Sequence, residues 1–237
     1  MGVKVLTVKE DILSANDENA KANRELADRH HVMMINVMSS PGAGKTTLIT
    51  RTINKFKEKI RLAVVEGDIA STIDADRIGK LGVPVVQINT AGGCHLDAIM
   101  VRKAMDALAL EEIDAIIIEN VGNLVCPAEF ALGAHKKVML LSVPEGDDKP
   151  YKYPLMFTEA EVVLVSKIDV KPYFDFDEAA FYKAVNGLNP SGKIFPVSAK
   201  TGEGLEAWFA WFEEAIIGKA GAPIVAPTST SAGCNRP

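Results

Sequence analysis

The chain has 237 residues, 48% of them hydrophobic and 24% charged, which is the composition of a globular protein that buries a full core. A formal net charge of −5 argues against the basic surface that DNA or RNA binding requires. No apolar run reaches the roughly 18 residues of a membrane-spanning helix, and the first residues lack the apolar segment of a secretory signal. The three cysteines are too few for a disulfide framework. We therefore expect a cytoplasmic protein that binds neither nucleic acid nor a membrane.

Short apolar runs alternate with longer amphipathic stretches along the chain, which is typical of an α/β fold with a mostly parallel sheet. Residues 1–31 come first and indicate a charged amphipathic helix, an appendage that packs on the sheet or on a partner. About seven strands are expected, several of them apolar throughout, at residues 32–38, 62–67, 84–89, 114–119, 137–143, 161–166 and 193–198. The helices between them are expected at residues 45–59, 72–81, 96–109, 177–186 and 204–217.

The strands and helices after the appendage are expected to form one domain, residues 32–220. From residue 221 the composition shifts to a run without any period, and we expect residues 221–237 to form a mobile tail. Cys234 lies in this tail and is given no role. Residues 145–154 mix charges, aromatic rings and prolines, and we interpret them as a solvated loop, with a partner-docking surface as the alternative.

The stretch SSPGAGKTTL (39–48) joins the first expected strand to the helix that follows it. Its glycines let backbone N–H groups converge on an anion, and the positive end of the new helix points at the same place. The stretch is close to the pattern G-x-x-x-x-G-K-[ST], in which Lys45 contacts the β- and γ-phosphates and the Thr46 hydroxyl binds Mg²⁺. Ser39 replaces the first glycine of that pattern. The predicted phosphate-binding residues are Gly42, Ala43, Gly44, Lys45, Thr46 and Thr47. The alternative is a glycine-rich turn with an incidental lysine.

Two short motifs end late strands, SKID (166–169) and SAK (198–200), and both resemble the guanine-reading loops of GTPases. A carboxylate at Asp169 can accept two hydrogen bonds from guanine, from N1 and the exocyclic amine, which adenine does not offer. Lys167 would lie along the base, and the Ala199 N–H would meet the 6-oxo group. Ser166 stands where such loops usually carry asparagine, so we expect a weaker tether to the phosphate loop. The predicted base-binding residues for GTP or GDP are Lys167, Asp169, Ser198, Ala199 and Lys200.

The string ENVG (119–122) begins at the end of another strand and fits the role of the D-x-x-G motif, with Glu119 in place of aspartate. Glu119 is expected to face Mg²⁺, and Gly122 to place its N–H by the γ-phosphate. Asp68 is a second candidate for Mg²⁺, through water, and its alternative role is a helix cap. No glutamine follows Gly122, only Asn123, and no arginine finger can be identified, so we expect slow hydrolysis that a partner or second subunit completes. The predicted catalytic residues are Lys45, Asp68, Glu119 and Gly122, and the predicted magnesium ligands are Thr46, Asp68 and Glu119.

Two further segments, GGCHLD (92–97) and NLVCP (123–127), supply Cys94, His95 and Cys126, which make up most of a nickel or zinc site. The fourth ligand of a tetrahedral centre would be water, another acceptor, or the same loop of a second chain. The alternative is that both cysteines are small buried hydrophobic residues and that His95 caps a helix. Because Cys126 closely follows the glycine expected at the γ-phosphate, we expect metal affinity and nucleotide state to be linked.

Several strings together resemble the HypB family of hydrogenase maturation factors, nickel-incorporation GTPases of the dimerising P-loop class. These strings are SSPGAGKTTL, EGDIAST, GGCHLDA, IENVGNLVCPAEFALG, SVPEGDDKPYKYPLMF and SAKTGEG, and the resemblance covers about residues 8–217. It implies a P-loop NTPase fold, GTP hydrolysis coupled to nickel delivery into [NiFe]-hydrogenase, and a homodimer favoured by GTP. It also implies metal at the subunit interface through Cys94, His95 and Cys126, and two partners: the HypA metallochaperone and the hydrogenase large subunit.

The chain lacks two features that some members of this family carry, a cysteine-rich amino-terminal nickel motif and a histidine-rich stretch. His30 and His31 are expected to end a helix, so only the metal site of the GTPase domain remains. Three other functions stay open. They are a urease-type nickel GTPase, whose Cys-Pro-His arrangement differs from this one, a non-catalytic metal-binding scaffold, and an ATP-dependent small-molecule kinase.

Overall fold

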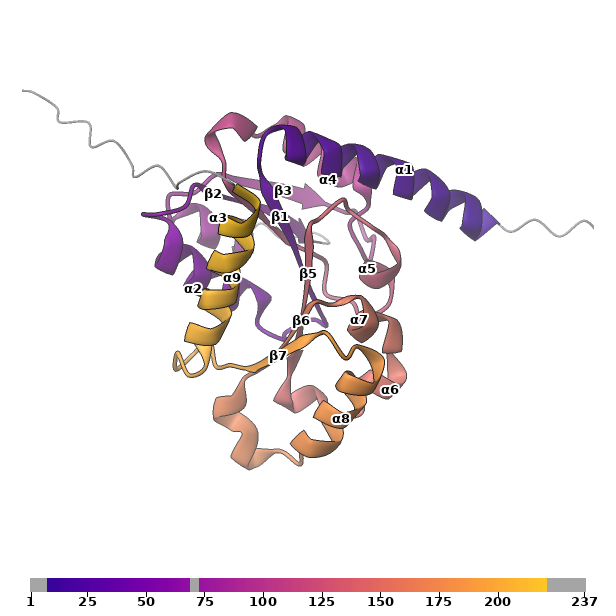
Figure 1. Cartoon of the computed structure of the whole chain (residues 1–237), viewed down its shortest axis with the longest axis vertical. Helices are drawn as coiled ribbons and strands as arrows, with labels where there is room; N and C mark the ends of the chain where they lie inside the picture. The colour runs from indigo at the N-terminus through magenta and orange to yellow at the C-terminus, as the bar shows by residue number, and fades with distance from the viewer. Residues whose placement is uncertain (1–7, 69–72, 221–237) are drawn as a thin grey trace, which may run out of the picture.

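A seven-stranded, fully parallel sheet forms the centre of the structure (Figure 1), a computed structural model that describes residues 8–68 and 73–220. The strand order is β3-β2-β4-β1-β5-β6-β7. The strands are β1 (Met33–Ser39), β2 (Leu62–Asp68), β3 (Val85–Asn89), β4 (Ala115–Glu119), β5 (Lys136–Ser142), β6 (Val162–Ser166) and β7 (Lys193–Pro196). Each begins and ends within two residues of the range expected from the sequence. The expected fold class is therefore confirmed.

Helices cover both faces of the sheet (Figure 1). One face carries α2 (Lys45–Phe56), α3 (Ile73–Gly79) and α9 (Leu205–Ala220). The other face carries α1 (Val8–Arg29), α4 (Ala98–Asp106), α5 (Cys126–Glu129), α7 (Pro154–Glu159) and α8 (Glu178–Leu188). Strand β1 shows how the alternation of side chains serves both layers, because Ile35 and Val37 pack with α2 while Met34 packs with α1 and α4. Apolar runs without polar alternation are thus explained by burial on both sides.

The amino-terminal helix α1 is bound to the domain by polar side chains as well as by packing. The Asn23 side chain, 1% exposed, donates to the carbonyl oxygens of Ala98 at 2.7 Å and Leu132 at 3.2 Å. Gly133 passes so close that a Cβ there would lie 2.4 Å from the Ala20 carbonyl oxygen. The helix therefore rests on α4 and on the segment before β5. It ends at Arg29, so the two histidines that follow lie directly after its end, as expected.

The structure corrects the expectation of a solvated loop at residues 145–154. That region holds the 3-10 turn η2 (Val143–Glu145), the short helix α6 (Lys149–Lys152) and the start of α7. Each of these elements has a proline in its first turn, where the missing N–H costs no hydrogen bond. The mixture of charges, aromatic rings and prolines favoured a loop, whereas these prolines begin short helices. Helix α5 and the 3-10 segments η1 (Leu110–Glu112) and η3 (Ile168–Tyr173) were also not anticipated.

Some expectations fall on residues 1–7, 69–72 and 221–237. The proposed tail with Cys234 lies outside the described residues, as does the first residue of the helix expected at 72–81. Across residues 8–68 and 73–220, no helix combines the length and the apolar character that crossing a bilayer demands.

Candidate nucleotide and metal sites

The loop between β1 and α2 has the backbone geometry of an anion cradle. Gly42 and Gly44 have φ angles of 75° and 103°, a left-handed conformation that residues with a Cβ rarely adopt. Helix α2 begins at Lys45, so the free N–H groups of its first turn lie beside the loop. Burial lowers the pKa of Lys45, although the charge of Glu119 opposes this shift. Nζ of Lys45 donates to Oγ of Ser39 at 2.9 Å, so the serine that replaces the first glycine of the pattern positions the lysine.

Two glutamates on adjacent strands lie beneath this loop. Oε1 of Glu119 accepts a hydrogen bond from the Thr46 hydroxyl at 2.8 Å. Glu66 is the direct register partner of Glu119, and the two side chains are only 3% and 5% exposed. In each, Oε2 is buried and lacks a hydrogen-bond partner among the described residues. Burial, followed by the charge of Glu119, raises the pKa of Glu66 to about 8. Burial also raises the pKa of Glu119 to about 7, against the attraction of Lys45.

A cavity of about 490 Å³ opens between the phosphate loop and these acids. Its lining includes Pro41, Gly42, Gly44, Lys45, Thr46, Thr47, Glu66, Gly67, Asp68, Asp74, Arg77, Glu119, Asn120, Val121 and Gly122. The three expected magnesium ligands are all in this set, and carboxylate and hydroxyl oxygens are the ligands that Mg²⁺ prefers. The buried, unpartnered carboxylate oxygens fit such an ion. Whether Asp68 caps a helix lies outside the described residues, because α3 begins at Ile73 and residues 69–72 are not described.

Gly122 approaches the phosphate loop so closely that only glycine fits. A Cβ at this position would lie 2.8 Å from N and 2.9 Å from Cα of Pro41. The next residue, Asn123, donates its N–H to the carbonyl oxygen of Ser39 at 2.8 Å. The segment after β4 and the phosphate loop are therefore in direct backbone contact.

A second cavity, of about 240 Å³, lies beside the phosphate loop and is bordered by all but one of the expected base-binding residues. Its lining includes Ala43, Gly44, Thr47, Leu48, Leu140, Ser166, Lys167, Asp169, Val170, Val197, Ala199 and Lys200. The Ser198 hydroxyl donates to Oδ1 of Asp169 at 2.7 Å, which orients this carboxylate. The Ser166 hydroxyl donates to the Ala43 carbonyl oxygen at 2.7 Å, so the tether to the phosphate loop exists although serine replaces asparagine. Both loops are thus fixed next to the anion cradle.

Cys94, His95 and Cys126 come together on the surface, with their ligand atoms within 4.8 Å of one another. The Sγ atoms of Cys94 and Cys126 are 3.2 Å apart, and Sγ of Cys94 is 3.6 Å from Nδ1 of His95. Cys94 is exposed, and Asp97, not His95, caps α4 by accepting from the Met100 N–H at 2.7 Å. The alternative of two buried hydrophobic cysteines and a capping histidine is therefore wrong.

The electrostatic environment suits a soft metal. Burial lowers the pKa of His95, against the charges of Asp97 and Glu129, and this favours the neutral imidazole that metals bind. The ring lies 3.9 Å from the ring of Phe130, centroid to centroid, which fixes its orientation. The hydrogen bond between the Cys126 and Cys94 thiols, together with burial, raises the pKa of Cys126. A metal bound here must therefore displace thiol protons.

The buried side chain of Asn120 joins the two sites. Its Oδ1 accepts from the N–H groups of Leu96 at 3.1 Å and Val121 at 2.9 Å. Its Nδ2 donates to Oδ1 of Asn36, on β1, at 3.3 Å. One amide therefore links the strand that leads into the phosphate loop, the segment after β4, and the segment that carries Cys94.

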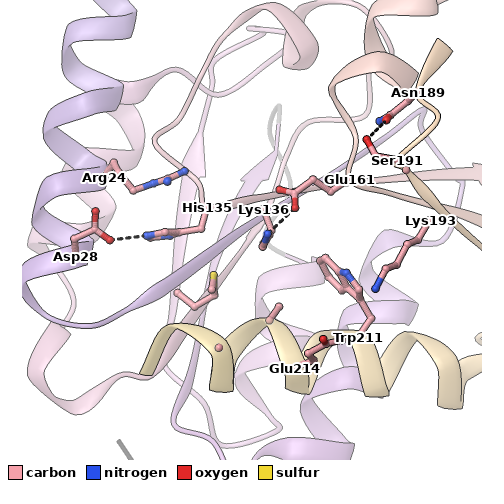
Figure 2. Close-up of a pocket in the computed structure, with 14 residues that line it drawn as sticks. Arg24, Asp28, His135, Lys136, Glu161, Asn189, Ser191, Lys193, Trp211 and Glu214 are labelled. Atoms are coloured by element: carbon pink, nitrogen blue, oxygen red, sulfur yellow. Dashed lines mark hydrogen bonds and ion pairs between the residues drawn. The ribbon is translucent and has the colours of Figure 1, made fainter. Parts of the chain in front are cut away.

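A third cavity, of about 790 Å³, lies at the other end of the strands, and Figure 2 shows its lining. There Asp28 on α1 faces His135, at 2.9 Å, and Lys136 pairs with Glu161 at 2.6 Å (Figure 2). Ligands of open parallel sheets bind at the carboxyl ends of the strands. This cavity is at the amino ends, and these contacts fasten α1 and the strand ends to each other.

Comparison with known proteins identifies the family. A family model described as the CobW/HypB/UreG nucleotide-binding domain matches residues 33–196. Hydrogenase maturation factor HypB of Rhizobium leguminosarum bv. viciae is 48% identical over 210 residues, which are 89% of this chain and 70% of that protein. The chain belongs to the HypB family of hydrogenase maturation factors.

Further similarities agree with this family assignment. Hydrogenase/urease maturation factor HypB of Helicobacter pylori is 44% identical over 86% of this chain and 85% of that protein. A crystal structure of Helicobacter pylori HypB in complex with nickel superposes with a TM-score of 0.82, at 42% identity, over 87% of this chain and 97% of that one. The HypB family assignment made from sequence strings is confirmed, and the phosphate loop belongs to a nucleotide-binding domain of P-loop NTPase type.

Sequence reasoning did not identify Glu66 or Asn120. Glu66 is a charged residue within a strand that is otherwise buried, and such a residue indicates a functional role when no partner is in reach. Asn120 directly follows Glu119, an expected magnesium ligand, and was passed over as part of a motif. Glu119, which lies beside Glu66, and Leu96 and Asn36, which contact Asn120, are all distant from these residues in sequence, so both roles depend on the fold.

Proposed function

We propose that this chain is a GTPase that binds nickel or zinc and couples its nucleotide state to dimerisation and to nickel delivery for [NiFe]-hydrogenase. The observation that carries this proposal is the 3.2 Å distance between the Sγ atoms of Cys94 and Cys126, because Cys126 closely follows Gly122, the glycine that touches the phosphate loop. Membership of the HypB family supports the role in hydrogenase maturation. The nickel complex of the Helicobacter pylori protein supports the choice of metal.

Guanine selectivity is proposed to come from Asp169. Its carboxylate accepts from Ser198 and borders the 240 Å³ cavity, where it would also accept from guanine N1 and the exocyclic amine. Lys167 would lie along the base, and the Ala199 N–H would donate to the 6-oxo group. Adenine offers neither of the two donors, so Asp169 would favour GTP over ATP.

Hydrolysis is proposed to follow the usual in-line course, in which water attacks the γ-phosphorus and the bond to the bridging oxygen of GDP breaks. Lys45 would leave Ser39 to contact the β- and γ-phosphates, and the N–H of Gly122 would donate to the γ-phosphate. Thr46, Asp68 and Glu119 would hold Mg²⁺, which neutralises phosphate charge when bound. The side chain of Asn123 accepts from the Val125 N–H at 2.8 Å and so stays in its turn, which is consistent with slow intrinsic turnover.

Metal binding is proposed to use Cys94, His95 and Cys126. Three protein ligands leave one coordination position of a tetrahedral centre open, and water or a second copy of the chain would fill it. A GTP-favoured homodimer would bring the two copies together at this exposed surface. The HypA metallochaperone and the hydrogenase large subunit are the proposed partners for nickel exchange and delivery, in the cytoplasm.

Two measurements test the proposal. Phosphate release from GTP is expected in the wild type and absent in Lys45→Ala. Nickel titrations with GDP and with a non-hydrolysable GTP analogue are expected to give different affinities, and Cys94→Ser should lose tight binding in both. Phosphate release that is undetectable in nucleotide-loaded wild type would favour the non-catalytic scaffold. ATP preference that survives in Asp169→Asn would favour the small-molecule kinase.

A urease role is the second candidate, because the Helicobacter pylori relative carries hydrogenase and urease maturation in its name. The same chemistry of nickel transfer would serve both targets. Restoration of hydrogenase activity, but not of urease activity, in cells that lack their own factors would support the first proposal.

A further inference from the structure

We propose that Glu66, together with Glu119, holds the divalent cation that accompanies the nucleotide phosphates. This inference rests on the proposed function, because it requires a nucleotide in the 490 Å³ cavity. It adds a ligand to that site which the phosphate-loop pattern does not contain. Its basis is the position of two buried carboxyl groups, each with an Oε2 atom that lacks a hydrogen-bond partner among the described residues.

The two side chains are placed together by the sheet. Glu66 on β2 and Glu119 on β4 are direct register partners in neighbouring parallel strands, which lie about 4.8 Å apart. Each lies two residues after an apolar residue, Val64 or Ile117, whose side chain packs with α2, and alternate residues of a strand share one face of the sheet. The carboxylates therefore point to the face on which the phosphate loop and Thr46 lie, and both line the cavity.

Their burial makes the doubly ionised pair costly without a cation. Glu66 is 3% exposed and Glu119 is 5% exposed, and Oε2 of each is buried without a hydrogen-bond partner in the described part of the chain. A buried carboxylate oxygen with no donor is strongly unfavourable, and two adjacent carboxylates repel each other. The Thr46 hydroxyl donates to Oε1 of Glu119, which is only one of the four carboxylate oxygens of the pair.

The charge of the cavity points to the same ligand. Among the described residues that line it, four are acidic (Glu66, Asp68, Asp74 and Glu119) and two are basic (Lys45 and Arg77). A cavity that receives phosphates should not be acidic unless a cation comes with them. Oxygen ligands at the base of a phosphate site match the preference of Mg²⁺, which combines one or two carboxylates with phosphate oxygens and water.

The test compares Glu66→Gln with wild type in GDP binding, measured with a fluorescent GDP analogue in Mg²⁺ and in EDTA. Glutamine keeps the volume and removes the charge. We expect Mg²⁺ to tighten GDP binding in the wild type and this tightening to fall at least about tenfold in Glu66→Gln, while affinity in EDTA is unchanged or improved. Mn²⁺ binding to the GDP complex, followed by electron paramagnetic resonance, should weaken in parallel. Glu161→Gln, at the amino ends of the strands, removes a charge without affecting either measurement.

The outcomes distinguish failure of the proposed function from failure of the inference about Glu66. Wild type that binds no guanine nucleotide would overturn the proposed function. Wild type that binds Mg²⁺ and GDP while Glu66→Gln does so equally well would overturn this inference alone. An equal loss of affinity with and without Mg²⁺ would also overturn it, since it would indicate a structural role. If Glu66→Gln does not fold, Glu66→Asp is the second variant, because it keeps the charge but has a shorter side chain. The same loss of the Mg²⁺ effect on GDP binding is expected in Glu66→Asp. Unchanged Mn²⁺ binding in this variant would count against the inference.

Discussion

Replacing Gly122 by alanine tests the contact between the segment after β4 and the phosphate loop. The added Cβ would lie 2.8 Å from N and 2.9 Å from Cα of Pro41, distances that real Cβ atoms essentially never show. Both neighbours are backbone atoms and cannot rotate away, so the loop itself must shift. Overpacking of this kind costs about 1–3 kcal/mol. If this cost is paid in the loop conformation that binds nucleotide, nucleotide affinity falls roughly 5- to 150-fold, because about 1.4 kcal/mol corresponds to a tenfold change in the dissociation constant.

The assay is a titration with a fluorescent GDP analogue, accompanied by urea unfolding. Gly187→Ala is the matched control, because Gly187 lies in α8 and an added Cβ there meets nothing within 4 Å. This control is expected to keep wild-type nucleotide affinity and to gain up to about 1 kcal/mol of stability from helix propensity. The reasoning is refuted if Gly122→Ala binds GDP like wild type with unchanged stability, or if the control shows the same loss of affinity.

Three further changes probe other contacts. Asn120→Ala leaves the buried N–H of Leu96 without its acceptor, so we expect a loss of about 1–3 kcal/mol in urea unfolding and weaker nickel binding, and unchanged nickel affinity would contradict the link. Asn23→Ala removes two buried hydrogen bonds of α1, and limited proteolysis should then cut this helix faster than in wild type. Although burial opposes it, hydrogen bonds and charge from Arg61 lower the pKa of Asp114. Its stabilising effect is therefore present above pH about 4 and is lost as the pH falls through the lowered pKa, so Asp114→Asn should lose stability at pH 7 and progressively less in acid.

The sheet could be predicted from the sequence because strands buried on both faces are apolar throughout and are separated by amphipathic helices. The phosphate loop could be located for a related reason, since glycines at positive φ and a lysine at the start of a helix leave a recognisable pattern. Cys94, His95 and Cys126 were predicted as metal ligands from their residue types and from the place of Cys126 shortly after Gly122. That they meet depends on the loops after β3 and β4 reaching each other, which the structure provides.

Other features could not be predicted, because they depend on which strands are neighbours. Nothing in a single sequence states that β2 lies between β3 and β4, so the pairing of Glu66 with Glu119 was out of reach. The short helices at residues 143–159 were missed for a local reason. Proline both begins and ends helices, and its mixture with charges and aromatic rings favoured a loop where short helices form.

The exposed thiol pair has a consequence for the redox behaviour of the protein. The Sγ atoms of Cys94 and Cys126 are 3.2 Å apart, so they need to approach by only about 1.2 Å to reach a disulfide bond length of about 2.05 Å. Removal of two electrons and two protons by an oxidant would join them covalently and take both sulfur donors away from an incoming ion. An air-oxidised chain would then keep its phosphate loop intact but lose two of its three proposed metal ligands, and a thiol reductant would restore them.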